Sequence, residues 1–250
     1  MFLFSIQSCQ KSDFNSTSHL NYSIENSPMI VGGRDVSSNH QFASHVAIIS
    51  KTDETGQTQI CTGVFISKNL IATAKHCLTD NNDDISVTFR TGSYDQTTDV
   101  VDLPIQQVFE MKNETNVKRD DLVIIQIMTP NDFPAEPVQI YQNQKILNSQ
   151  IILLGYGVNS ADGSGLGQLR SKNISADEFD FSQNTFEINQ KLNHGGVCFG
   201  DSGGPALAYD EFSQKYFLVG IASAVIGSAC ANQSIFMNIL FYKNQIQELL

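Results

Sequence analysis

The segment with the clearest potential for chemistry is Gly200-Asp201-Ser202-Gly203-Gly204-Pro205. A nucleophilic serine needs small neighbours, because a substrate carbonyl must reach its hydroxyl and backbone N–H groups must point at the developing oxyanion. The glycines around Ser202 meet this requirement. The segment also contains G-x-S-x-G, the nucleophile elbow of α/β-hydrolases, so Ser202 is a candidate nucleophile in either of two kinds of fold.

The order of the histidines separates these two folds. An α/β-hydrolase places its catalytic histidine after the serine. All histidines of this chain precede Ser202, which argues against the elbow; they are His19, His40, His45, His76 and His194. A general base must therefore come from upstream, and Thr73-Ala74-Lys75-His76-Cys77 supplies a histidine beside a cysteine.

A carboxylate that could orient this histidine stands in Asp121-Leu122-Val123-Ile124-Ile125-Gln126-Ile127. Asp121 begins an apolar strand, where it can be buried against an imidazole. Asp120 is a competing carboxylate directly beside it. The candidate residues follow one another in the order His76, Asp121, Ser202.

The elements that must position these residues are short apolar segments with many β-branched side chains. After residue 28, turn residues separate runs of about five to eight residues, which is typical of an all-β sandwich or barrel. The predicted strands are 45–50, 61–66, 70–74, 86–90, 100–105, 122–128, 151–155, 185–188, 205–208, 216–224 and 235–238. Only residues 242–250 have apolar positions at helical spacing, which predicts a short C-terminal helix.

Several motifs occur in an order and at separations that resemble the chymotrypsin-like (trypsin-fold) serine proteases. They are Ile30-Val31-Gly32-Gly33, Thr73 to Cys77, Asp121 to Ile127, Gly155-Tyr156-Gly157 and Gly200 to Pro205. The resemblance runs from residue 30 to the C-terminal helix. It implies an all-β fold of two six-stranded antiparallel β-barrels, with a short C-terminal helix and the active site between the barrels. We expect a leader or propeptide at residues 1–29 and a protease domain at 30–250, with barrels at about 30–135 and 136–250.

The resemblance also implies a role for each candidate residue. His76 would take the Ser202 proton as the hydroxyl attacks a peptide carbonyl, and Asp121, favoured over Asp120 by the family's register, would hold the imidazole. Backbone N–H groups of Gly200 and Ser202 would bind the oxyanion. No cofactor is needed. No metal is expected either, because residues 92–102 lack the calcium-loop glutamates of trypsin.

The five cysteines include no C-x-x-C pair and no zinc-type spacing with histidine, which argues against a metal site. Their number permits two disulfides and one leftover thiol without fixing the pairing. The resemblance pairs Cys61 with Cys77 and Cys198 with Cys230, and it leaves Cys9 unpaired. Such disulfides imply an oxidising compartment outside the cytoplasm.

The specificity pocket can be placed by counting back from Ser202. Six residues upstream stands Gly196, where trypsin carries the aspartate that pairs with Lys or Arg. The residues implied to line the pocket are Gly196, Val197, Ser223, Val225 and Ser234. The pocket is similar to that of leukocyte elastase. We therefore expect small or medium aliphatic residues before the scissile bond and poor cleavage after Lys or Arg.

The same resemblance implies a zymogen that is cleaved between Met29 and Ile30. The freed Ile30 amine would form a buried ion pair with Asp201 and order the oxyanion loop. Met29 does not suit a trypsin-like activator but does suit an aliphatic pocket, which leaves self-activation and activation by another protease both open. The alternative is that Met29 is an incidental residue of a flexible leader.

Charge and hydropathy exclude several kinds of partner. Lys+Arg 15 against Asp+Glu 26 gives a net charge of -11, which repels nucleic acid and anionic lipid headgroups. The sequence has no apolar run of the roughly 20 residues that a spanning helix needs. We expect a secreted or extracytoplasmic monomer whose partners are protein or peptide substrates and protein protease inhibitors.

The first residues hold a weak export signal. Residues 1–6 resemble the tail of a signal peptide, and Ile6-Gln7-Ser8-Cys9 resembles a weak bacterial lipobox. One interpretation is a lipid on Cys9 that anchors the protein to a membrane. The other, of equal weight, is a leftover thiol in a cleaved leader.

The alternative function is that of a catalytically inactive protease homologue acting as an extracellular binding module. The complete set of His76, Asp121 and Ser202 argues against it. Tyr156 and Ala224 stand where tryptophan is usual in the family, which should affect packing and docking of the substrate strand more than chemistry.

Overall fold

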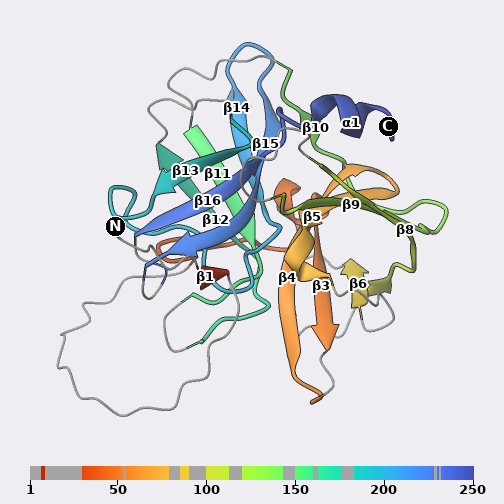
Figure 1. The fold of residues 1–250 in the computed structure, drawn as a ribbon, viewed down its shortest axis with the longest axis horizontal. Coiled ribbons are helices and arrows are strands. Elements are labelled where there is room, and N and C mark those ends of the chain that lie inside the picture. Colours follow the sequence, from red (N-terminus) through yellow and green to blue (C-terminus); the bar gives the residue numbers. More distant parts are fainter. Residues whose placement is uncertain are drawn as a thin grey trace.

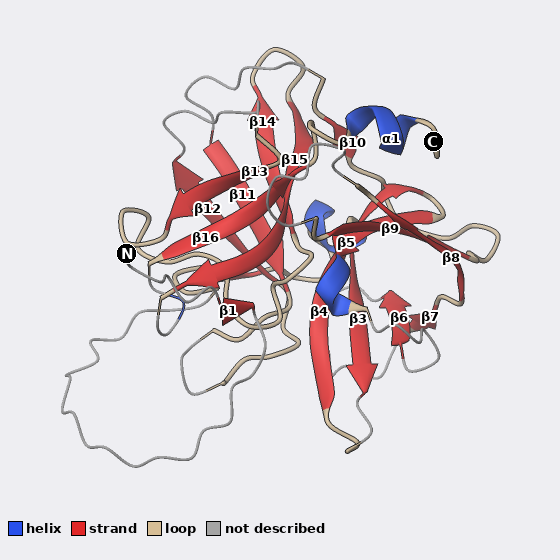
Figure 2. Ribbon diagram, in the orientation of Figure 1, coloured by secondary structure: helices blue, strands red, loops and turns tan. Residues whose placement is uncertain are grey.

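The computed structural model describes residues 7–8, 30–52, 55–78, 85–89, 100–112, 120–142, 150–159, 163–175, 183–227, 230 and 232–250. Strands dominate these residues, as Figure 2 shows, and their single α-helix is α1 (Lys243–Gln247). Two short 3-10 helices, η1 (Gln41–Ser44) and η2 (Lys75–Cys77), flank strands of the first sheet. The predicted all-β fold with a short C-terminal helix is confirmed.

The first barrel-like sheet comes from the N-terminal half of the chain. Its strands are β3 (Val46–Thr52), β4 (Thr58–Ser67), β5 (Leu70–Ala74), β6 (Ile85–Phe89), β7 (Val101–Asp102), β8 (Ile105–Glu110) and β9 (Leu122–Ile127). They pair in the order β7-β6-β3-β4-β5-β9-β8. Of these seven strands only β7 is two residues long, so the sheet has the six longer strands that were expected.

The second barrel-like sheet comes mainly from the C-terminal half. Its strands are β1 (Gln7–Ser8), β2 (Arg34–Asp35), β10 (Gln139–Ile140), β11 (Gln150–Gly155), β12 (Arg170–Ser175), β13 (Thr185–Asn189), β14 (Pro205–Asp210), β15 (Lys215–Ile226) and β16 (Gln233–Asn238). The main path runs β13-β16-β15-β14-β11-β12-β2, and both β1 and β10 pair with β15. Without its three two-residue strands, this nine-stranded sheet also has six strands.

The two sheets curve side by side in Figure 1, with the orange and yellow strands of the first facing the green and blue strands of the second. The chain crosses between them around β10, where Val138 donates to Phe65 of the first sheet at 2.8 Å and Tyr141 donates to Leu218 of the second at 3.1 Å. The helix α1 follows the last strand of the second sheet, yet the backbone of Lys112 beside β8 exchanges two hydrogen bonds with the Gln245 side chain. The C-terminal helix therefore ties the two halves together.

Each half has its own aromatic core. In the first, Phe65, Phe89 and Phe133 meet edge to face, with ring centroids 4.9 to 5.6 Å apart. In the second, Phe186 and Phe236 stack at 5.3 Å across β13 and β16. Such contacts add to the hydrophobic burial of each ring. Each sheet is thus packed around its own core, and the loops between the two sheets carry the candidate site.

The strand predicted at 100–105 differs from the structure. Within this range only β7 and the first residue of β8 are strand, Leu103 and Pro104 lie between them, and β8 continues beyond the predicted end to Glu110. Proline lacks the N–H that a ladder position needs, so it interrupts the pairing there. The structure also has a strand, β12, that the sequence analysis did not predict.

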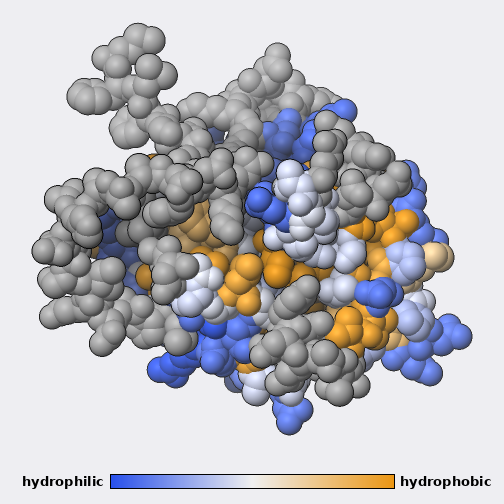
Figure 3. Space-filling model, turned by 90° about the horizontal axis from the view of Figure 1, so that it is seen from below, coloured by the Kyte–Doolittle hydropathy of each residue, from blue (hydrophilic) through white to orange (hydrophobic). Residues whose placement is uncertain are grey.

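None of the described helices is long and apolar enough to cross a lipid bilayer. On the face shown in Figure 3, orange apolar residues gather in patches that blue hydrophilic residues interrupt.

Candidate active site

The pairing of β5 with β9 brings His76 and Asp121 together. Ala74 at the end of β5 lies opposite Leu122 at the start of β9, so the chain leaves one strand where it enters the other. His76 follows on η2, and its backbone N–H donates to Asp121 Oδ1 at 2.9 Å. Its ring Nδ1 lies 2.8 Å from Asp121 Oδ2. The carboxylate thus holds both the backbone and the ring of His76.

A third hydrogen bond to the Asp121 carboxylate comes from a second residue, Ser223, and the sequence analysis did not predict this contact. The Ser223 hydroxyl donates to Asp121 Oδ2 at 2.5 Å. Burial is the largest influence and would raise the pKa of Asp121, but the hydrogen bonds from His76 and Ser223 and the charge of His76 outweigh it. The pKa therefore lies below its ordinary value, and Asp121 is a buried carboxylate that stays ionised.

Asp120 is directed elsewhere. The buried hydroxyl of Tyr242, from the C-terminal end of the chain, donates to Asp120 Oδ1 at 2.9 Å. Adjacent residues of an extended chain point to opposite sides, so only one of the two carboxylates can face His76. In the structure that residue is Asp121.

The loop that carries Ser202 is held by both sheets. Thr62 of β4 donates its backbone N–H to the Ser202 carbonyl at 2.8 Å, and Gly203 donates to Ala222 of β15 at 2.7 Å. Gly203 has a φ of +80°, and a Cβ there would overlap the Thr62 carbonyl and the Thr73 hydroxyl. Glycine at this position allows the loop to pass between the two sheets.

The two atoms that would exchange a proton, Ser202 Oγ and His76 Nε2, are both buried. Neither Ser202 Oγ nor His76 Nε2 has a hydrogen-bond partner among the described residues. The hydrogen bond between them is not formed in this structure. Catalytic hydrogen bonds are often long or poorly aligned before substrate binds, so this geometry is compatible with proton transfer in a complex.

The loop before Ser202 leaves backbone donors free. Among the described residues, the N–H groups of Gly200 and Ser202 have no hydrogen-bond acceptor. Gly200 has a φ of +94°, a conformation that suits glycine, and a Cβ there would lie only 2.8 Å from the Gly157 Cα. Both donors are thus available for an anionic oxygen.

Asp201 is completely buried beside this loop. Its Oδ1 accepts from the Gly157 N–H and its Oδ2 from the Cys198 N–H, both at 2.8 Å. Burial raises the pKa of Asp201 to about 7, although the two backbone donors and the Arg170 charge act in the opposite direction. A Cβ on Gly155 or Gly157 would overlap the carboxylate, which explains the glycines of that motif.

Ile30 is fully buried in this uncleaved chain, and its φ is +26°. The ion pair expected between Ile30 and Asp201 belongs to the cleaved form, in which the nitrogen of Ile30 is a free amine. Beside it, the carbonyl of Gly32 accepts from Lys172 Nζ at 3.1 Å, so the segment after the expected cleavage point already packs against β12. Met29 lies outside the described residues.

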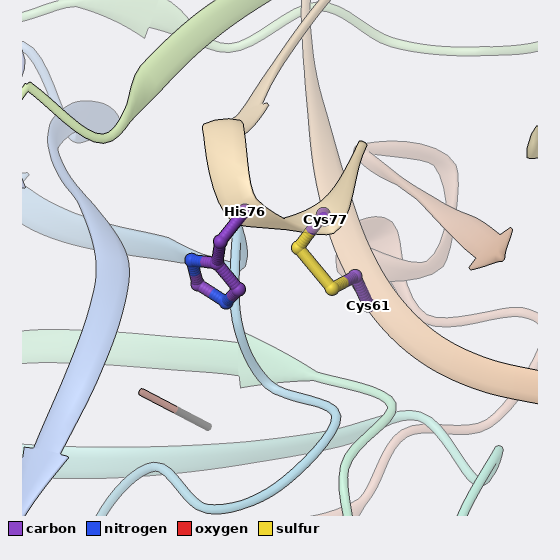
Figure 4. A group of neighbouring side chains, drawn as sticks. All are labelled: Cys61, His76 and Cys77. Carbon is purple, nitrogen blue, oxygen red and sulfur yellow. A yellow bond between two sulfur atoms is a disulfide. The ribbon is translucent and has the colours of Figure 1, made fainter. Parts of the chain in front are cut away.

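Both cysteine pairs are disulfide-bonded as the resemblance implied. Cys61 and Cys77 have Cα atoms 6.1 Å apart, and Cys198 and Cys230 have Cα atoms 5.2 Å apart. Figure 4 shows the first disulfide beside the ring of His76. The ligand atoms of these three residues cluster within 4.8 Å, but sulfurs that are bonded to each other are not thiolate ligands for a metal. Cys9 lies outside the described residues.

The expected pocket residues are all buried, but they do not all face the same way. The expected residues are Gly196, Val197, Ser223, Val225 and Ser234. Ser223 stands at a bulge where β15 shifts its register against β16, and its hydroxyl bonds to Asp121. The Ser223 side chain therefore supports the carboxylate, a role different from the expected lining of the pocket. Bulges commonly redirect a side chain beside an active site.

Gln190 is a buried residue that contacts the expected pocket segment, and the sequence analysis did not single it out. It follows β13, is 1% exposed, and donates from Nε2 to the carbonyls of Val197 at 3.2 Å and Cys230 at 2.8 Å. A single polar residue after a predicted strand gives no sequence signal of this position.

The edge of β15 next to the pocket accepts an extended strand. The backbone of β1 pairs with it antiparallel, with Gln7 opposite Val225 and Ser8 opposite Ala224. Unpaired strand edges bind extended peptides through backbone hydrogen bonds.

Comparison with known proteins agrees with this geometry. The model of the family named Trypsin matches residues 30–246. A trypsin-like protease of Streptomyces glaucescens is 26% identical over 194 residues, which are 70% of this chain and 68% of that protein. The clotting factor G beta subunit of Tachypleus tridentatus is 23% identical over 221 residues, 76% of this chain and 71% of that protein. The thrombin-like enzyme ancrod-2 of Calloselasma rhodostoma is 23% identical over 214 residues, 77% and 78% respectively.

A chain with two barrel-like sheets and this cluster of histidine, aspartate and serine between them, matched over residues 30–246, belongs to the trypsin family of serine proteases. The predicted resemblance to chymotrypsin-like serine proteases is confirmed at the level of the family.

Proposed function

We propose that this protein is a serine endopeptidase that cleaves protein or peptide substrates through an acyl-enzyme. Ser202 is the nucleophile, His76 is the general base and then the general acid, and Asp121 orients the imidazole and stabilises its charged form. The hydroxyl of Ser202 attacks the scissile carbonyl, its proton passes to His76 Nε2, and the same proton then goes to the leaving amine. Water repeats these steps to release the acyl group.

The observation that carries this proposal is the pair of contacts from one carboxylate to His76. Asp121 accepts from the backbone N–H at 2.9 Å and lies 2.8 Å from Nδ1, which turns Nε2 away from the carboxylate. A ring whose Nδ1–H is held in this way presents Nε2 as the acceptor. The unpartnered Ser202 Oγ and the free N–H groups of Gly200 and Ser202 are compatible with the remaining roles.

The sequence predicts small or medium aliphatic residues before the scissile bond, and we propose a preference for small or medium uncharged residues that includes them. Gly196 offers no charge at the base of the pocket, and Val197 and Val225 are apolar and buried there. A lysine or arginine would lose its hydration without gaining a carboxylate. The edge of β15 that pairs with β1 supports docking of an extended peptide.

The chain is proposed to be an exported zymogen. Its two disulfides favour an oxidising location outside the cytoplasm. The β1 strand pairs at the edge of β15 where a substrate strand would dock, so the leader would compete with substrate until it is removed. Cleavage between Met29 and Ile30 would then supply the amine that pairs with Asp201.

The proposal is tested by exposing purified protein beginning at Ile30, and its Ser202→Ala variant, to casein and to a peptide library. We expect the first to cleave and the variant to be at least about 10³-fold slower. A folded protein that starts at Ile30 and cleaves no peptide would favour an inactive binding module, and a library profile dominated by Arg, Lys or Tyr would contradict the proposed preference.

A further inference from the structure

The space beside Gly196, at the expected base of the specificity pocket, is filled by a side chain from another part of the chain. Gly196 has no side chain of its own, and a Cβ placed there would overlap Gln190 Oε1 and lie 2.6 Å from Gln190 Cδ. The carboxamide of Gln190 therefore occupies the space in which a side chain at position 196 would begin. At the expected base of the pocket, the group that lies against position 196 is therefore the Gln190 carboxamide.

The orientation of this carboxamide is fixed by its two donors. Gln190 Nε2 donates to the carbonyl oxygens of Val197 and Cys230. Exchanging the nitrogen and the oxygen would set a carbonyl oxygen against two others, which leaves one arrangement that satisfies the network. Oε1 must therefore point away from these two carbonyls.

Gln190 Oε1 and Ser234 Oγ are both buried, and neither has a hydrogen-bond partner among the described residues. Ser234 pairs with Ile188 of β13 and with Val225 of β15. The Gln190 backbone continues the β13 pairing by donating to Asn232 at 2.8 Å. Because residues two apart on a strand share a face, Gln190 and Ser234 lie diagonally on the same face as Val225.

Buried polar atoms without partners are uncommon and costly, and two of them on one face beside the expected pocket call for a ligand that completes them. We propose that Gln190 Oε1 and Ser234 Oγ form the polar base of the specificity pocket, which receives an uncharged substrate side chain ending in a hydrogen-bond donor, such as Thr, Asn or Gln. This inference rests on the proposed endopeptidase function and narrows its substrate class. Aliphatic side chains of the same size fit, but they leave Gln190 Oε1 without a donor.

The test compares peptide substrates that are identical except for the residue before the scissile bond. The pairs are Thr against Val, Asn against Leu, and Gln against Met, which are nearly equal in size and differ in the donor. For the wild type we expect kcat/KM to be about tenfold higher for the donor-bearing member of at least one pair, because a buried acceptor discriminates against an analogue that lacks the donor. Gln190→Met should bring the ratio to about one, and Ser234→Ala should lower it in part.

Two controls separate an effect on the pocket from an effect on the rest of the protein. Gln106→Met makes the same chemical change at an exposed position of β8 and should leave every ratio unchanged. The rate at which a small phosphonylating reagent labels Ser202 reports the catalytic groups without using the pocket, so it is measured in every variant and each substrate ratio is taken from protein that labels at Ser202.

Wild-type protein that labels at Ser202 but cleaves the aliphatic member of every pair at least as fast would overturn the polar base while leaving the endopeptidase function standing. A donor preference that survives in both Gln190→Met and Ser234→Ala would also overturn it. Wild-type protein that neither labels nor cleaves would overturn the proposed function, and this inference with it.

Discussion

Thr62 donates its backbone N–H to the carbonyl of Ser202 at 2.8 Å, so a strand of the first sheet directly holds the serine loop of the second. The Thr62 hydroxyl donates to the Gly200 carbonyl at 3.1 Å and accepts from the Tyr156 N–H at 3.0 Å. One buried threonine thus connects β4 to the serine loop and to the glycine motif around Tyr156. Thr62 therefore couples the relative position of the two sheets to the conformation of the serine loop.

Replacing this threonine should lower both stability and activity. Thr62→Val keeps the shape but leaves the Gly200 carbonyl and the Tyr156 N–H without their partner, which should cost about 1–3 kcal/mol in the free energy of unfolding. Thr62→Ser retains the hydroxyl and is the matched control. Urea unfolding together with kcat measurements would check this; equal losses in the two variants would show that the hydroxyl is not responsible.

The adjacent aspartates should differ sharply in their effect on catalysis. Asp121→Asn keeps the shape beside His76 but favours the wrong imidazole tautomer, so kcat should fall by about 10⁴-fold. Asp120→Asn removes a charge that faces the Tyr242 hydroxyl and leaves an amide oxygen that can still accept from it, so kcat should change by less than about tenfold. Steady-state kinetics on one peptide substrate would decide, and similar losses in both variants would contradict the assignment of Asp121.

The resemblance to a known family was sufficient to predict the two barrels and both disulfides, whereas contacts that the family motifs do not specify were missed. Asp121 could be placed because it begins an apolar strand and the family register favours it over Asp120. The hydrogen bond from Ser223 to Asp121 could not, because it joins residues 102 positions apart and depends on a bulge in β15. The same holds for Gln190, whose position is set by carbonyls of Val197 and Cys230.

The strand β12 was missed for a related reason. Its inward positions include Arg170 and Lys172, which are buried because they donate to backbone carbonyls, among them those of Gly165 and Gly32. A search for alternating apolar residues cannot detect a strand whose buried side chains are cationic. Long side chains with apolar stems can fill an interior if their charged ends find partners.

The uncleaved chain should lose stability as the pH rises. Burial raises the pKa of Asp201 from 3.8 to about 7, so between about pH 4 and pH 7 the folded state binds more protons than the unfolded state. The free energy of unfolding should therefore fall in this window, by up to about 1.4 kcal/mol per pH unit for this one group. Urea unfolding of Ser202→Ala, with and without Asp201→Asn, isolates the contribution; the same slope in both proteins would contradict it.

Cleavage at Ile30 should abolish this pH-dependent loss of stability. A free amine paired with Asp201 favours the ionised carboxylate and lowers its pKa, so the loss of stability between pH 4 and pH 7 should disappear in protein that starts at Ile30.

N-terminal sequencing of purified wild type and Ser202→Ala shows which protease cleaves the bond between Met29 and Ile30. An Ile30 start in wild type alone indicates self-activation, an Ile30 start in both indicates another protease, and full activity in an uncut chain rules out a zymogen.

The measurement that bears most directly on the central claim is covalent labelling of Ser202 by a serine-directed phosphonylating reagent, followed by peptide mass mapping of protein that starts at Ile30. The account predicts one label, on Ser202, whose formation slows by at least about 10³-fold in His76→Ala because no general base remains. Labelling of another serine, or a labelling rate that does not depend on His76, would contradict it.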